Sequence, residues 1–149
     1  MEISAATIEE IKNHASLEFP DECCGVVVGL AGRGQRVVRV RNIQDQMHAD
    51  DPGRYPRTAR TAYSGHPADL KEALDLSSGA GNSLLAFYHS HPDHDAYFSD
   101  EDVAQATPFG EPSYPEALQI VVSVYDGQAG QLRAYAWSAG EQTYEEAPL

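Results

Sequence analysis

The chain has 149 residues, a length that suits one domain with its own hydrophobic core. Its 23 acidic residues outnumber its ten lysines and arginines, and the formal net charge of −13 excludes nucleic acid and anionic membranes as expected partners. The sequence has no apolar run of about 18 residues and no basic and apolar leader, which predicts a cytoplasmic protein.

The first part of the chain predicts a helix followed by a β-hairpin. Apolar residues at spacings of three and four predict a helix over 4–19, ended by Pro20, with His14 at the edge of the apolar stripe and on the surface. The apolar run 23–30 predicts a buried strand, and 35–43 a second strand with one face in solvent. Cys23 and Cys24 would face opposite sides of the sheet, so no disulfide joins them and a reducing compartment suits them.

The middle of the chain is less regular. Residues 44–62 show no period and contain two prolines, which indicates a long loop and a candidate substrate-binding flap, with His48 exposed in it. Pro67 begins a predicted helix over 68–76, and His66 is expected beside the start of that helix.

The chemistry is concentrated after the short apolar run 83–88, which predicts a buried strand. Side chains alternate along a strand, so His89 and His91 leave its end on the same face. Ser99 can cap a helix that runs to Ala106, and Asp102, one turn in, points back toward the helix start. Two histidines, one carboxylate and an open fourth position are typical of a catalytic zinc site, because a structural site normally has four protein ligands.

The last part of the chain predicts a strand over 118–125, a turn, a strand over 131–137, and one more edge strand after Ser138. We therefore expect a single α/β domain over residues 1–149, with a twisted sheet flanked by helices. No pattern in the sequence indicates an oligomeric state.

His-x-His occurs in several metal-binding folds, and its neighbours separate them. The string from His89 to His94 also matches metallo-β-lactamases, but no histidine follows to complete that site. A cupin would have glutamate where Asp95 stands, and a nucleobase deaminase would need H-x-E and P-C-x-x-C motifs.

The complete pattern H-x-H-P-x6-S-x-x-D, from His89 to Asp102, resembles the JAMM (MPN-plus) metalloproteases. Bacterial members also carry P-x-E-x-C-G near the first strand, which is present here from Pro20 to Gly25 with Glu22 as its glutamate.

This resemblance implies a JAMM/MPN-like (cytidine-deaminase-like) fold with a curved mixed β-sheet, and a zinc-dependent hydrolase of peptide or isopeptide bonds. It implies Zn²⁺ held by His89, His91 and Asp102, with Glu22 as general base and Ser99 as a donor to the oxyanion. Relatives act on ubiquitin-like or sulfur-carrier proteins, which are the implied partners. The alternative is a catalytically inert MPN scaffold, a class that typically lacks a ligand or the glutamate. His94 is expected to be a solvated loop residue.

Overall fold

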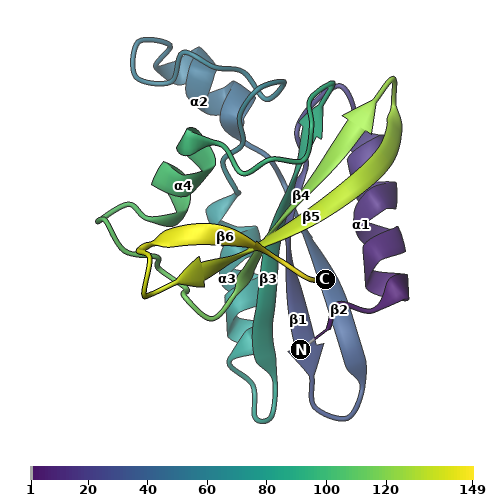
Figure 1. Cartoon of the computed structure of the whole chain (residues 1–149). Coiled ribbons are helices and arrows are strands. Elements are labelled where there is room, and N and C mark those ends of the chain that lie inside the picture. Colours follow the sequence, from purple (N-terminus) through teal and green to yellow (C-terminus); the bar gives the residue numbers. More distant parts are fainter. Residues whose placement is uncertain (1) are drawn as a thin grey trace.

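Six strands form one sheet in the order β2-β1-β3-β4-β5-β6 in the computed structural model, which describes residues 2–149 (Figure 1). The elements are α1 (Ala5–Glu18), β1 (Cys24–Leu30), β2 (Gly34–Val40), α2 (Gln44–Asp50), α3 (Pro67–Ser77), β3 (Ser83–Pro92), α4 (Asp100–Ala106), β4 (Leu118–Tyr125), β5 (Gln128–Ser138) and β6 (Thr143–Ala147). Strands β3 and β4 run parallel, and the other neighbours are antiparallel. Parallel neighbours require a crossover, and here the crossover carries α4.

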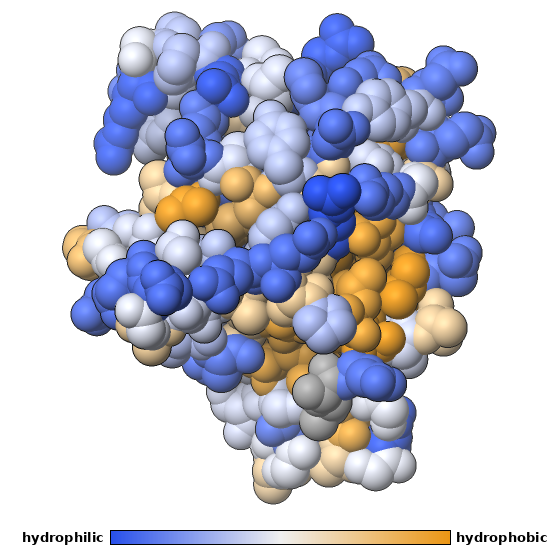
Figure 2. All heavy atoms as spheres, viewed as in Figure 1, coloured by the Kyte–Doolittle hydropathy of each residue, from blue (hydrophilic) through white to orange (hydrophobic). Residues whose placement is uncertain are grey.

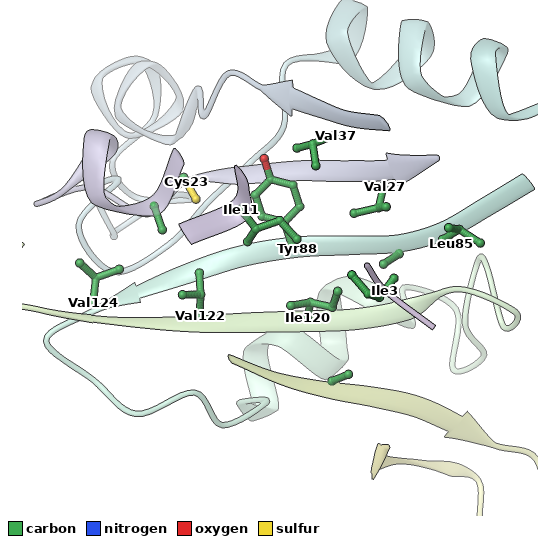
Figure 3. Packing of buried hydrophobic residues seen from close by; sticks show 13 residues of the cluster. Ile3, Ile11, Cys23, Val27, Val37, Leu85, Tyr88, Ile120, Val122 and Val124 are labelled. Atoms are coloured by element: carbon green, nitrogen blue, oxygen red, sulfur yellow. The ribbon is translucent and has the colours of Figure 1, made fainter. Parts of the chain in front are cut away.

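Helices α1 and α3 pack on opposite faces of the sheet (Figure 1). The α1 side holds the larger core, in which Ile11 lies beside the ring of Tyr88 (Figure 3). Successive residues of β1 point to the two cores in turn, Val27 toward α1 and Val26 toward α3, and this explains the uniformly apolar run of that strand. Cys23 and Cys24 divide between the two cores as predicted, and both are buried free thiols.

The predicted ends of the first helix are confirmed, and the predicted position of one of its residues, His14, is wrong. Ser4 caps α1 by accepting a hydrogen bond from the N–H of Thr7, and the helix ends before Pro20. The predicted surface position of His14 is wrong, because its side chain is buried against the sheet and Nδ1 lies 2.6 Å from the Tyr88 hydroxyl. Ala5, one of the apolar residues spaced three and four apart that predicted the helix, is exposed. Compared with the predicted apolar face, the buried face of α1 is therefore rotated about the helix axis toward Thr7 and His14.

Two further predictions are corrected between residues 34 and 62. Strand β2 was expected to have one face in solvent. Arg39 on that face is exposed, but Val37 on the same face is buried in the α1-side core. The expected loop over 44–62 begins with the short helix α2. His48 lies in that helix and is half-buried rather than exposed, with Nδ1 2.8 Å from the carbonyl oxygen of Tyr55.

The remaining predicted elements are confirmed by α3, α4, β4, β5 and β6, and the mixed α/β architecture is as expected. Hydrophilic residues dominate the upper part of the face in Figure 2, whereas apolar side chains gather in its middle. Across residues 2–149, no helix has the length and apolar character needed to cross a membrane.

Candidate metal centre and active-site cleft

The last residues of strand β3 position the two predicted histidine ligands. His89 and His91 are both buried and point to the same side of the strand, so that their Nε2 atoms lie 3.1 Å apart. Strand β3 is central, flanked by β1 and β4, and the backbone that carries the two rings is therefore held from both sides. The alternation predicted from the sequence produces this convergence.

The third predicted ligand reaches the histidines from the start of α4. Ser99 and Asp102 form a reciprocal capping box, in which each side chain accepts a hydrogen bond from the backbone N–H of the other. The box fixes the Asp102 carboxylate, whose oxygens lie 3.1 Å from His89 Nε2 and 3.3 Å from His91 Nε2. The capping box that begins α4 therefore also holds the Asp102 carboxylate beside the two histidines.

These three side chains fit a tetrahedral metal ion. Zinc bonds of about 2.0–2.1 Å place neighbouring ligand atoms about 3.3 Å apart. Here the two Nε2 atoms are 3.1 Å apart, His89 Nε2 lies 3.1 Å from Oδ1 of Asp102, and His91 Nε2 lies 3.3 Å from its Oδ2. The cluster contains three protein ligands, which matches a site with one position open for water or substrate.

The protonation states also suit a metal. Burial lowers the pKa of His89, and its imidazole is neutral. Burial opposes ionisation of Asp102, but the two histidines beside it and the backbone N–H of Ser99 hold the pKa of this carboxyl well below its usual range. Neutral imidazoles and an ionised carboxylate are the forms that bind a metal.

Two contacts that sequence reasoning missed orient the histidines. His91 Nδ1 lies 2.9 Å from the carbonyl oxygen of Asp95, which leaves Nε2 directed at the cluster. The Tyr63 ring stacks on His89 with centroids 4.6 Å apart. Neither the carbonyl nor the tyrosine belongs to a recognisable motif, because both come from irregular segments.

Glu22 lies two residues before β1, beside the cluster of His89, His91 and Asp102. Its backbone N–H donates to the carbonyl oxygen of Ala59 at 2.7 Å, and its side chain is buried. Burial and the negative charge of Asp102 raise the pKa of Glu22 to about 9.

All five predicted site residues line or adjoin one cleft of about 530 Å³. Glu22, Ser99, His91 and Asp102 line it, together with Arg57, and His89 lies behind them against His91. His94 is exposed at the rim, as expected. His66 is not part of the cluster and caps α3 by accepting a hydrogen bond from the N–H of Ala68. The arrangement can place a metal, a buried carboxylate and a hydroxyl around one substrate carbonyl.

Comparisons with known proteins agree with this geometry. A family model described as prokaryotic homologs of the JAB domain matches residues 4–138. The chain is 30% identical over 145 residues to the CysO-cysteine peptidase of Mycobacterium tuberculosis, covering 96% of this chain and 86% of that protein. It is 26% identical over 145 residues to the desampylase of Haloferax volcanii, covering 95% and 90% of the two chains. A JAB1/MPN domain protein from Archaeoglobus fulgidus shares the fold, with a TM-score of 0.56 and 19% identity over 100% of this chain and 96% of that one.

Proposed function

The chain belongs to the prokaryotic JAB-domain (JAMM) family, and from this we propose that it is a zinc-dependent peptidase or isopeptidase acting on ubiquitin-like proteins. Its proposed substrates are the C-terminal tail or the conjugates of a ubiquitin-like sulfur-carrier protein, and residues 1–149 form one catalytic domain. The names of the relatives, a CysO-cysteine peptidase and a desampylase, support this substrate class. The single observation that carries the proposal is the convergence of His89, His91 and Asp102 beside the buried Glu22.

His89, His91 and Asp102 hold the metal in this proposal. Bound zinc supplies Lewis acidity, which lowers the pKa of a coordinated water to about 7 and polarises the substrate carbonyl. Glu22 lies in the same cleft, and as general base it takes a proton from the attacking water and then delivers it to the departing amine. Its burial excludes bulk water, which would otherwise compete for this proton.

Ser99 is the proposed oxyanion donor. Its hydroxyl oxygen accepts the N–H of Asp102 at 3.1 Å, and its own O–H remains available to donate toward the cleft. Loss of one such donor typically costs roughly 3 kcal/mol of transition-state stabilisation. The inert-scaffold alternative leaves the retention of Glu22, Ser99 and all three ligands in one cleft without a role.

The test combines metal analysis with cleavage of a ubiquitin-like protein that carries one extra residue or a conjugate after its diglycine. We expect about one zinc per chain in the unchanged protein, as three converging protein ligands predict. His89→Ala should lose both zinc and cleavage, whereas Glu22→Gln should keep zinc and lose cleavage. A Glu22→Gln protein with normal turnover would refute the assigned mechanism. A zinc-free protein that takes up none on titration would favour the scaffold.

A further inference from the structure

A second cavity, of about 190 Å³, opens beside the active-site cleft on the α3 side of the sheet. Its floor is formed by residues of three neighbouring strands, Cys24 of β1, Phe87 of β3 and Gln119 of β4. His89 follows Phe87 by two residues, so the cavity and the proposed metal ligands share one face of the sheet.

The cavity and the cleft differ in chemical character. No charged side chain is among the described residues that line the cavity, and its lining is mostly aliphatic and aromatic. The cleft, by contrast, is lined by several carboxylates, two histidines and Arg57. Apolar cavities of this size bind apolar groups, since one of about 150 Å³ accepts a molecule of benzene. The cavity therefore fits one aliphatic or aromatic side chain.

Two residues, Tyr63 and Gln105, border both the cavity and the cleft. Gln105 Nε2 donates a hydrogen bond to the carbonyl oxygen of Tyr63 at 3.2 Å, which links α4 to the segment before α3. The Tyr63 ring stacks on His89, so the cavity begins one side chain away from a proposed metal ligand. A peptide bound in the cleft therefore has the cavity within reach of its side chains.

The cavity is formed before any ligand binds. On one side, the Tyr114 ring packs against Phe87 with centroids 5.2 Å apart. The loop that carries Tyr114 is tied to α4, because the N–H of Ser113 donates to the carbonyl oxygen of Ala106 at 3.2 Å. Largely pre-formed apolar hollows with a few polar groups are typical of ligand sites.

The pairing of β1 with β3 indicates which part of a substrate the cavity faces. Cys24 pairs with His89, and the two strands are antiparallel. Glu22 precedes Cys24 by two residues and therefore lies toward the His91 end of β3. Phe87 lies toward the other end. Because the proposed base delivers its proton to the leaving amine, the leaving group lies toward Glu22 and the acyl part of the substrate toward the cavity.

The spacing along β3 selects one residue of the acyl part. Phe87 and His89 are two residues apart, which corresponds to about 6.8 Å in a strand. In an extended tail that ends in diglycine, the first residue with a side chain lies two residues before the one whose carbonyl reacts, at about the same distance. The residue directly before the diglycine is therefore the one that meets the cavity.

We propose that this cavity is a specificity pocket, which binds an apolar side chain directly before the diglycine of the ubiquitin-like substrate. The inference rests on the proposed function and adds a requirement on the substrate tail, namely an aliphatic or aromatic residue at this place. Burial of that side chain supplies binding energy away from the cleaved bond and holds the tail in position while the carbonyl reacts.

The test varies the residue X in a short tail peptide that ends in X-Gly-Gly. The peptide is titrated into the protein with zinc added, and it has no bond left to cleave because it is the product of the reaction. Leucine at X should bind at least tenfold more tightly than alanine, since three more carbon atoms leave water. Asparagine has nearly the shape of leucine but should bind no better than alanine, because its amide loses hydrogen bonds to water. The same order is expected in kcat/KM when X is varied in a ubiquitin-like protein that carries one extra residue after its diglycine.

Filling the cavity should abolish this preference. Ala106 lines the cavity at the end of α4, whereas Ala104 of the same helix is exposed and lines neither space. Ala106→Leu should reduce the difference between the leucine and alanine peptides to less than threefold and leave zinc content unchanged. Ala104→Leu, the matched control, should keep the full difference. If Ala106→Leu fails to fold, Ser113→Leu narrows the same cavity from an exposed position.

Equal binding of the leucine and alanine peptides would overturn the proposal, and so would a leucine preference that persists when the cavity is filled. A cavity-dependent preference at the residue after the cleaved bond would also overturn it, because the leaving group would then occupy the cavity. Cleavage of the whole substrate without any preference at X rejects the specificity pocket alone. A cavity-dependent preference in binding, without cleavage by the zinc-loaded protein, rejects the proposed function alone.

Discussion

Ser90 and Cys23 are joined by two hydrogen bonds that connect the strand of the two histidines to the segment that carries Glu22. The N–H of Cys23 donates to the Ser90 hydroxyl oxygen at 2.7 Å, and the N–H of Ser90 donates to the carbonyl oxygen of Cys23 at 3.1 Å. Ser90 stands between His89 and His91, and Cys23 directly follows Glu22. The serine therefore ties the segment that carries Glu22, the proposed general base, to the strand that carries the two histidines proposed as metal ligands.

Ser90→Ala should consequently separate activity from metal binding. The substitution leaves the buried N–H of Cys23 without its acceptor, which costs about 1–3 kcal/mol of unfolding free energy. We expect kcat to fall at least tenfold, because Glu22 is no longer held in register, while zinc content is retained. Urea unfolding, metal analysis and turnover provide the three readouts.

The control is Thr7→Val, which removes a part-buried hydroxyl of α1 that donates to Gln35 of β2 at 2.8 Å. It should lose comparable stability and no activity. Equal losses of kcat in the two variants would show that Ser90 acts through stability alone.

Tyr63 is expected to contribute to metal affinity through its stacking on His89. An aromatic pair contributes about 0.5–1.5 kcal/mol, so Tyr63→Ala should weaken zinc binding about tenfold in a competition assay with a chelator. Tyr63→Phe keeps the ring and should bind zinc like the unchanged protein. Equal weakening in both variants would assign the effect to the hydroxyl instead.

The parts of the site that could be predicted from sequence are those encoded by local spacing. The alternation of a strand determines that His89 and His91 converge, and the length of one helical turn determines that Asp102 points back over Ser99. Contacts between distant segments have no such signal. Tyr63 and Ser90 act through partners that only the folded chain brings near.

The same distinction explains the fold predictions that failed. Helix α2 has seven residues and no side-chain cap at Ile43, so the 44–62 segment lacks both a helical period and a start signal. His14 lies at the edge of a helical stripe, and only the Tyr88 hydroxyl, which comes from β3, explains its burial. The flap interpretation of 44–62 stays a prediction. Deleting the segment would also remove the carbonyl of Ala59 that holds Glu22, so point variants are the sharper test.

His14 should make stability depend on pH. Burial, with a further contribution from the charge of Arg39, lowers its pKa to about 4 from the usual 6.5. Between these two values the unfolded chain binds a proton that the folded chain does not, so the unfolding free energy decreases as the pH falls from about 6.5 to about 4. The decrease should reach about 2 to 3 kcal/mol.

His14→Gln keeps a hydrogen-bonding partner for Tyr88 but does not titrate. Its unfolding free energy, measured by urea at several pH values, should lack this component. The difference between the two profiles isolates His14 from the carboxylates that titrate in the same range. Parallel profiles would contradict the assignment.

Within the part of the chain that the structure describes, Arg57 is the single lysine or arginine that lines the cleft. The other charged groups of the cleft are mainly carboxylates. It pairs with Glu101 of α4 at 2.6 Å, and both side chains are about half exposed. Arg57→Gln should leave the melting temperature almost unchanged, because exposed ion pairs contribute little. It should raise KM for a tail peptide about fivefold, since the excess of carboxylates would then repel the peptide carbonyl groups.

Arg54→Gln is the matched control, because Arg54 is exposed in the same segment but does not line the cleft. With the short peptide it should behave like the unchanged protein. A similar rise of KM in both variants would place the effect outside the cleft.

The placement of the site across the sheet also determines when the protein becomes active. Glu22 precedes β1, the histidines end β3, and Asp102 enters from the crossover to β4, so the reactive groups meet only after strands distant in sequence have paired. Pairing of such strands is late and slow in folding, because it closes long loops. A partly synthesised or misfolded copy therefore lacks an assembled site, and proteolytic activity is withheld until the chain has reached its native topology.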